Sequence, residues 1–192
     1  MNEGEKSQQS HSPIIFLDID GVLNRTKHAT HIRLDDDLLE RFRRLVETTG
    51  ANIVLSTYWR HFRDYISYIL SNYGIPEEKI LGSTPGFNRS MKGRKASDDQ
   101  EYSSRAQEIR AWLQEYFQLE MGIHNSANSG GGHYDKISEE HGIRFVILDD
   151  RPTAADDSEF LQKRFIHCDT TQGITEEEVD RAIRILLHDD GS

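Results

Sequence analysis

The chain has 192 residues, a formal net charge of −10 at pH 7 and a single cysteine, Cys168. This length suits one α/β domain with a substantial core and is too short for two. The negative charge argues against a broadly basic nucleic-acid-binding surface but leaves room for a local basic patch. One cysteine cannot form an internal disulfide, no apolar run reaches membrane-spanning length, and the N-terminus has no secretory apolar region. We therefore expect a cytoplasmic protein that does not enter membranes.

Apolar runs in the first half of the chain alternate between strand and helix patterns. Residues 1–12 are polar and predict a mobile tail. The continuous apolar run that follows predicts a strand buried on both faces, as in a parallel sheet. Apolar residues then recur at helical spacing before Gly50 and again before Gly74. The predicted order is a strand at 14–17, a helix at 34–46, a strand at 52–55, a helix at 62–73 and a strand at 79–82.

The second half continues this alternation around two polar segments. Residues 83–103 and 124–134 are rich in polar and charged residues and glycine, and we expect loops or a small flap there. Ser104 with Gln107, and Thr175 with Glu178, have the spacing of a helix capping box. The predicted elements are a helix from 104 to 117, strands at 145–148 and 165–168, and a final helix from 175 to 187.

Strands that alternate with helices predict an α/β fold. The connections between parallel strands are right-handed crossovers, which place helices on both faces of the sheet. We therefore expect a three-layer, Rossmann-like parallel sheet in a single domain that covers residues 13–188.

Residues suited to phosphate chemistry follow three of the predicted strands. Asp18 and Asp20 end the first strand, Ser56 and Thr57 end the second, and Asp149 with Asp150 ends a later one. Because the carboxyl ends of parallel strands lie at one edge of a sheet, we expect these side chains to converge.

A group of carboxylates at one edge requires a cation to offset their mutual repulsion, and oxygen ligands of this kind suit Mg²⁺. A solvated acidic turn is the alternative explanation for a single Asp-x-Asp. It explains acidic residues at two strand ends less well.

The first motif, Asp18-Ile19-Asp20-Gly21-Val22-Leu23-Asn24, resembles that of the haloacid-dehalogenase (HAD) superfamily of phosphatases. Ser56 resembles the second motif of that superfamily, and Asp149-Asp150 the fourth. The segments 54–60, 105–113, 147–150 and 169–175 are similar to the HAD domain associated with Swiss Army Knife RNA-repair proteins. The resemblance spans residues 13–188 and implies a HAD-type fold. The short segments 25–33 and 83–103 leave no room for a large cap domain.

The resemblance also implies a two-step phosphoryl transfer. Asp18 would be the nucleophile that becomes an aspartyl-phosphate, and Asp20 the general acid and then base. Ser56 would bind a phosphoryl oxygen. Asp18, the backbone carbonyl of Asp20, and Asp149 and Asp150 would hold Mg²⁺.

The cation of the third motif is open among Arg105, Lys95 and Lys92. Arg105 is favoured because it begins the helix before the fourth motif, whereas the lysines match by residue type. Three candidate substrate contacts lie near the motifs, namely Asn24, Thr57 and Arg60. Two more, Lys92 and Lys95, lie in a basic loop that also carries Arg89 and Arg94. Trp59 and Trp112 are expected to serve as packing residues.

The absence of a large cap favours a bulky phosphorylated substrate, such as a nucleic-acid end or a phosphoprotein. Three alternatives remain at this point: a nucleotidase or small-molecule phosphatase with a cap from another subunit, a phosphoacceptor switch, and a non-catalytic phosphate-binding domain. The switch is disfavoured because its phosphorylated aspartate would lie on a middle strand, where this chain has Ser56 and Thr57. The oligomeric state does not follow from the sequence.

Overall fold

The structure, a computed structural model, describes residues 11–26, 33–85, 104–121, 143–152 and 159–188. For 117–121 it describes the backbone of the helix alone. Residues 1–10 of the expected tail at 1–12, the loop at 124–134 and most of the segment 83–103 lie outside the described residues.

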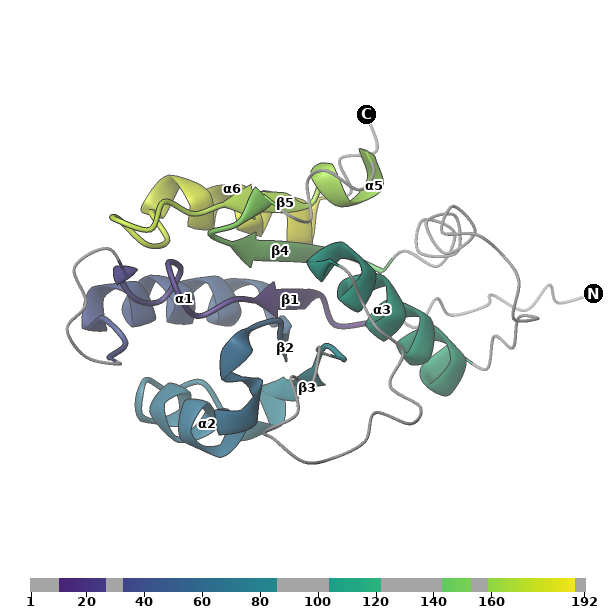
Figure 1. Ribbon diagram of the computed structural model, residues 1–192, viewed down its shortest axis with the longest axis horizontal. Helices are drawn as coiled ribbons and strands as arrows, with labels where there is room; N and C mark the ends of the chain where they lie inside the picture. Colours follow the sequence, from purple (N-terminus) through teal and green to yellow (C-terminus); the bar gives the residue numbers. More distant parts are fainter. Residues whose placement is uncertain (1–10, 27–32, 86–103, 122–142, 153–158, 189–192) are drawn as a thin grey trace, which may run out of the picture.

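Five parallel strands form one sheet in the order β3-β2-β1-β4-β5 (Figure 1). Their bounds are β1 Ile14–Leu17, β2 Asn52–Leu55, β3 Ile80–Ser83, β4 Phe145–Asp149 and β5 Phe165–His167. The first strand lies at the centre and pairs with both β2 and β4. This topology confirms the predicted Rossmann-like parallel sheet.

The pairing register aligns the last residues of β1 and β2 with Leu148 of β4, one residue before that strand ends. Leu17 of β1 pairs with Leu55 of β2 on one side and with Leu148 of β4 on the other. The next residue along each strand direction is therefore Asp18, Ser56 or Asp149. This register is the structural reason that residues far apart in the sequence meet at one edge.

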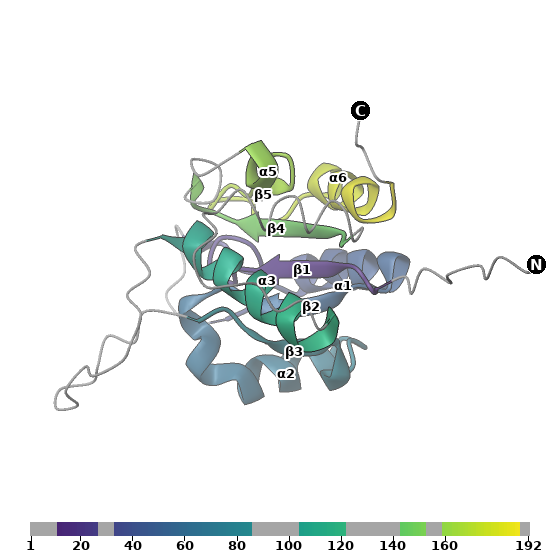
Figure 2. The same ribbon diagram turned by 90° about the vertical axis from the view of Figure 1, so that its right-hand side faces the viewer.

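Helices cover both faces of the sheet (Figures 1 and 2). The helices α1 (Asp36–Thr49), α2 (Arg63–Asn72) and α6 (Glu176–Leu187) pack on one face. The helices α3 (Arg105–Met121) and α5 (Glu159–Gln162) pack on the other. Two short 3-10 helices, η2 (Tyr58–Phe62) and η3 (Glu77–Lys79), precede α2 and β3.

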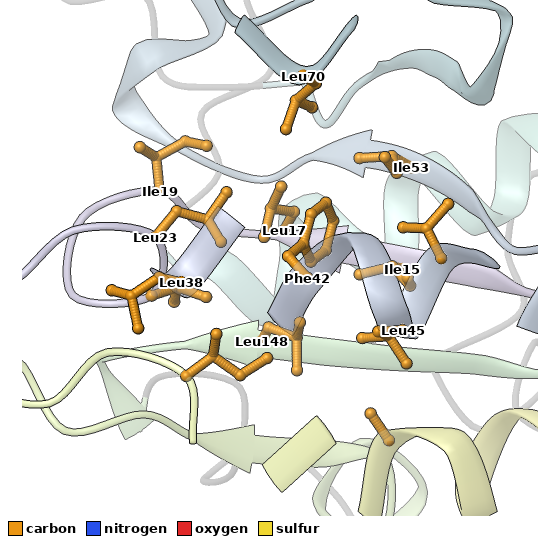
Figure 3. Packing of buried hydrophobic residues seen from close by; sticks show 14 of the residues in the cluster. Ile15, Leu17, Ile19, Leu23, Leu38, Phe42, Leu45, Ile53, Leu70 and Leu148 are labelled. Atoms are coloured by element: carbon orange, nitrogen blue, oxygen red, sulfur yellow. The ribbon is translucent and has the colours of Figure 1, made fainter. Parts of the chain in front are cut away.

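The core is divided between the two faces because successive strand residues point to opposite sides. On one side, Ile15 and Leu17 join Phe42 and Leu45 of α1 (Figure 3). On the other, Phe16 lies edge-to-face with Trp112 of α3 at 5.4 Å between ring centroids. All four residues of β1 are fully buried, which explains their uninterrupted apolar character.

The predicted elements are found with small shifts at their ends. The third strand begins one residue later than expected and the last strand ends one residue earlier. Thr175 and Glu178 form the predicted capping box of α6, and the backbone N–H of Gln107 donates to Ser104 Oγ at 3.3 Å. Within the described parts of the chain, no helix is long and apolar enough to cross a membrane.

Candidate active site

Three carboxylates meet at the carboxyl ends of β1 and β4. Oxygen atoms of Asp18, Asp149 and Asp150 all lie within 4.8 Å of one another, an arrangement that could hold a metal ion. Asp18 is 4% exposed and Asp149 is 1% exposed, so both carboxylates are almost removed from water. The main-chain N–H of Ile19 donates to Asp18 Oδ1 at 2.8 Å and fixes that carboxylate.

Burial makes this cluster a strong proton or cation acceptor. It is the main cause of the raised pKa of Asp149, about 7, and the charge of neighbouring Asp18 adds to it. Burial likewise raises the pKa of Asp18, against the opposing effect of Arg105, and the pKa of Asp150. A divalent cation would relieve the same repulsion that a proton relieves here.

One oxygen of Asp149 provides a direct test of whether a cation fits. Asp149 Oδ1 accepts the backbone N–H of Arg151 at 2.9 Å. Asp149 Oδ2 is buried and has no hydrogen-bond partner among the described residues. An unsatisfied buried carboxylate oxygen is costly, and a hard cation in the cluster would satisfy it. The donor set therefore fits Mg²⁺.

Arg105, at the start of α3, lies beside these carboxylates. Its Nη2 lies 3.6 Å from Asp18 Oδ2, and its Nε lies 3.6 Å from Asp149 Oδ2. Its Nη1 donates to Ser56 Oγ at 3.4 Å. The guanidinium thus contacts residues at the ends of all three central strands. Of the candidates for the third-motif cation, Arg105 is the one among the described residues, and Lys92 and Lys95 lie outside them.

Asp20 is held differently from Asp18. The indole Nε1 of Trp59 donates to Asp20 Oδ2 at 3.0 Å, and Asn24 Nδ2 donates to Asp20 Oδ1 at 3.0 Å. The main-chain N–H of Gly21 in turn donates to Asn24 Oδ1 at 2.9 Å. Both oxygens of Asp20 therefore accept a hydrogen bond from a fixed donor. The carboxylate of Asp20 is not one of the three that form the cluster.

Sequence reasoning missed the contact between Trp59 and Asp20. It assigned Trp59 to packing, and the ring does pack against the core. Yet a half-buried indole N–H also requires an acceptor, and Trp59 closely follows the end of β2. That position was the available signal. Asn24 was predicted to contact substrate, and in this structure its side chain links Asp20 to Gly21.

Gly21 allows the chain to turn sharply past Asp150. Its φ is +75°, in the left-handed region that favours glycine. A Cβ at this position would lie 2.5 Å from Asp150 Cβ, closer than side-chain atoms can approach. The glycine of the first motif is thus required both by backbone conformation and by the close approach of a cluster carboxylate.

The remaining predicted site residues lie along the segment after β2. Thr57 is fully buried, accepts the backbone N–H of Trp59 at 3.2 Å, and hydrogen-bonds the Asp18 carboxyl, which opposes the upward shift of its pKa. Arg60 donates to Thr57 O at 2.8 Å, to Thr84 O at 3.1 Å and to Glu108 Oε2 at 3.1 Å. These contacts brace the segment against β3 and α3. The predicted contact of Arg60 with substrate stays a prediction.

The fold and the carboxylate edge define a class, the HAD-like α/β domains, and comparison with protein families agrees. The model of the HAD domain in Swiss Army Knife RNA repair proteins matches residues 14–125, more than half of the chain. The chain therefore belongs to this family. Comparison with curated proteins gave no match, and comparison with solved structures gave none. Asp149 and Asp150 lie beyond the matched residues, and the sheet register places them at the site.

Proposed function

We propose that this protein is a Mg²⁺-dependent phosphomonoester hydrolase that works through an aspartyl-phosphate on Asp18. One observation carries the proposal: Asp18, Ser56 and Asp149 lie at neighbouring strand ends, and Arg105 contacts all three. A buried carboxylate can attack a phosphorus atom while a neighbouring guanidinium and hydroxyl hold the outer oxygens of the phosphoryl group.

In the first step, an oxygen of Asp18 attacks phosphorus in line and the bond to the leaving oxygen breaks. Asp20 donates a proton to that oxygen, so the leaving group departs as an alcohol. In the second step, Asp20 takes a proton from water, which attacks phosphorus and releases phosphate and free Asp18. Arg105 and Ser56 bind the phosphoryl oxygens throughout. Mg²⁺ held by Asp18, Asp149, Asp150 and the backbone carbonyl of Asp20 would offset the charge of the phosphoryl group.

The hydrogen bonds to Asp20 support its role as a proton carrier. Trp59 and Asn24 fix the carboxylate two residues from the nucleophile. Proton transfer is efficient when the donor is held within reach of the reacting oxygen, because the entropy of positioning has been lost in advance. An unheld carboxylate on a flexible turn would lack this advantage.

For the substrate, we propose a phosphate on a macromolecule, with a phosphorylated nucleic-acid end as the leading candidate. The family match is to domains of RNA repair proteins. The segments 25–33 and 83–103 are too short for a large cap, so a bulky phosphate ester can enter. Local positive charge on this acidic protein would come from Arg105 at the site and from the loop residues Arg89, Lys92, Arg94 and Lys95.

The test compares purified protein on 5′- and 3′-phosphorylated oligonucleotides, nucleotides, phosphopeptides and sugar phosphates with Mg²⁺. We expect oligonucleotides to be dephosphorylated fastest at low ionic strength, with a rate that falls steeply as salt increases. Activity should vanish with a chelator, and Asp149→Ala should raise the Mg²⁺ requirement. Restoration by Zn²⁺ alone would overturn the metal assignment.

Charge reversal at Lys92 and Lys95 separates substrate binding from catalysis. The double variant Lys92→Glu with Lys95→Glu should raise KM for the oligonucleotide more than for para-nitrophenyl phosphate, because the small ester does not extend to the loop. Equal effects on both substrates would mean that a loop lysine acts at the phosphoryl group. A preference for a small monoester would favour the nucleotidase or small-molecule phosphatase alternative.

A further inference from the structure

An exposed tyrosine lies beside the carboxylate site and has no role in the chemistry described above. Tyr58 is the first residue of η2 and directly follows Ser56 and Thr57. Its ring centroid lies 5.7 Å from Cζ of Arg105 and 5.6 Å from Cζ of Arg151. Arg105 begins α3 and Arg151 follows β4, so the ring of Tyr58 lies near guanidinium groups from two other elements.

The ring remains open to a ligand despite these contacts. Tyr58 is 66% exposed, although large aromatic side chains usually bury most of their surface. Guanidinium groups over an aromatic ring hold it by cation–π attraction. The start of η2 is also fixed, because Thr57 Oγ1 accepts the backbone N–H of Trp59. An exposed ring on a fixed backbone, held by charged neighbours, can stack on a ligand without a further loss of side-chain entropy.

We propose that Tyr58 is the stacking surface for the nucleobase next to the phosphate that is removed. This inference rests on the proposed phosphatase function and specifies its substrate: a phosphorylated nucleic-acid end whose terminal base is unpaired. The base would lie on the ring of Tyr58, and Arg151 would lie beside the sugar-phosphate chain. Base–aromatic stacking is tolerant of sequence, so this contact selects a nucleotide terminus without selecting a base.

The guanidinium that the ring and the nucleophile share favours a nucleobase over an aromatic ring esterified directly to phosphate. Arg105 contacts both the ring of Tyr58 and the carboxylate of Asp18, at 5.7 Å to the ring centroid and 3.6 Å to Oδ2. The same guanidinium thus contacts the ring of Tyr58 and the carboxylate that would carry the phosphoryl group. In a nucleotide, a sugar separates the base from the phosphate, whereas in phosphotyrosine one oxygen does.

Tyr68 offers a matched control for Tyr58. It is the same residue type, has the same exposed fraction of 66%, and lies on α2. No contact between its ring and a guanidinium is found among the described residues. Replacement of either tyrosine removes a similar exposed ring, and one of the two lies at the site.

The experiment measures kcat/KM on phosphorylated trinucleotides, with the phosphate at the 5′ or 3′ end, that carry either adenine or no base at the phosphate-bearing sugar. The readout is the ratio of the two kcat/KM values. We expect wild type to prefer the base-bearing substrate about tenfold, in line with the strength of base–aromatic stacking. Tyr58→Leu should bring the ratio close to one, whereas Tyr58→Phe and Tyr68→Leu should retain the wild-type ratio.

Each other outcome overturns the inference in a distinct way. A wild-type ratio of one, or a ratio that Tyr58→Leu leaves unchanged, would exclude base stacking on this ring. An equal loss on both substrates would mean that Tyr58 acts by positioning Arg105. Faster turnover of phosphotyrosine peptides than of either trinucleotide would assign the ring to another class of macromolecule. Failure to hydrolyse any phosphate ester would overturn the proposed function itself.

Discussion

At the scale of single residues, the two aspartates of the first motif lie in different environments. Asp18 is buried beside a guanidinium and two further carboxylates. Asp20 is half-buried and is held by neutral donors from Trp59 and Asn24. The first environment suits a nucleophile that shares a cation, and the second suits a carboxyl group that exchanges protons with a leaving group and water.

Trp59→Phe tests whether the indole positions Asp20. The variant keeps an aromatic ring against the core but removes the donor to Asp20 Oδ2. We expect kcat for para-nitrophenyl phosphate to fall between about tenfold and a hundredfold, with a smaller change in KM, because a misplaced catalytic group loses rate more than binding. Steady-state kinetics measures both values.

Trp112→Phe is the matched control for that variant. Trp112 lies on α3 and packs against Phe16 of β1 and Tyr116 of α3, away from the carboxylates. A similar fall in kcat for both variants would show that loss of packing, and not loss of the hydrogen bond, lowers activity. Thermal unfolding of both proteins shows whether each is folded at the assay temperature.

The residues of the site were predictable from the sequence to different degrees. Asp18 and Asp20 stand out because two acids and a glycine directly follow a continuous apolar run. The hydrogen bond from Trp59 to Asp20 was not predictable in the same way. It joins the segments that follow β1 and β2 and depends on the rotamer of the Trp59 side chain. The contacts of Arg60 with Thr84 and Glu108 likewise depend on tertiary packing.

At the scale of elements, the register of the central strands does most to build the site. Leu17, Leu55 and Leu148 are paired with one another in register, so the residues that follow them, Asp18, Ser56 and Asp149, meet at one edge of the sheet. The turn after β1 then has to pass close to Asp150, and this approach requires Gly21.

Gly21→Ala tests the turn after β1. The substitution places a side chain in the left-handed region, at a cost of about 1–2 kcal/mol, and also brings its Cβ against Asp150. We expect a lower free energy of unfolding and a higher Mg²⁺ requirement for activity, because Asp150 must move. Denaturant unfolding and a Mg²⁺ titration of the rate measure these two effects.

Gly50→Ala provides the control, because Gly50 has a similar φ of +64° and nothing within 4 Å of its would-be Cβ. It should lose stability from backbone conformation alone and keep the wild-type Mg²⁺ requirement. Equal loss of stability in the two variants, with no change in Mg²⁺ requirement for either, would contradict the importance of the contact with Asp150.

Long helices were predictable from the sequence and short ones were not. The fourteen residues of α1 and the twelve of α6 carry clear apolar periodicity, and α6 also carries a capping box. The helix α5 has four residues and η3 has three, too few for periodicity to appear. The helix η2 was not predicted, and only its last residue, Phe62, fell within the predicted helix at 62–73, because 3-10 geometry leaves little trace in the residue pattern.

At the scale of the whole molecule, the carboxylate cluster links stability to pH. The pKa of Asp149 rises from 3.8 to about 7, so between these values the folded protein binds a proton that the unfolded chain has lost. The folded state is therefore stabilised as pH falls through this range and loses that stability as pH rises towards 7. Asp18 and Asp150 act in the same direction.

We expect the melting temperature of the metal-free protein to rise as the pH is lowered from about 8 to about 6, and Asp149→Asn to reduce this dependence. Mg²⁺ should raise the melting temperature more at the higher pH, because the cation needs deprotonated ligands. Calorimetry with and without a chelator measures both effects. A melting temperature that falls on acidification equally in wild type and Asp149→Asn would contradict the raised pKa.

The most direct test of an aspartyl-phosphate on Asp18 is acid quenching during turnover of a ³²P-labelled phosphate ester, followed by identification of the labelled peptide. We expect a phosphoryl label on the peptide that contains Asp18, and hydroxylamine should release this label as it does from an acyl phosphate. The folded Asp18→Asn variant should carry no label and should lose turnover by several orders of magnitude. Steady turnover with no label on Asp18, together with wild-type activity in Asp18→Asn, would contradict the aspartyl-phosphate mechanism.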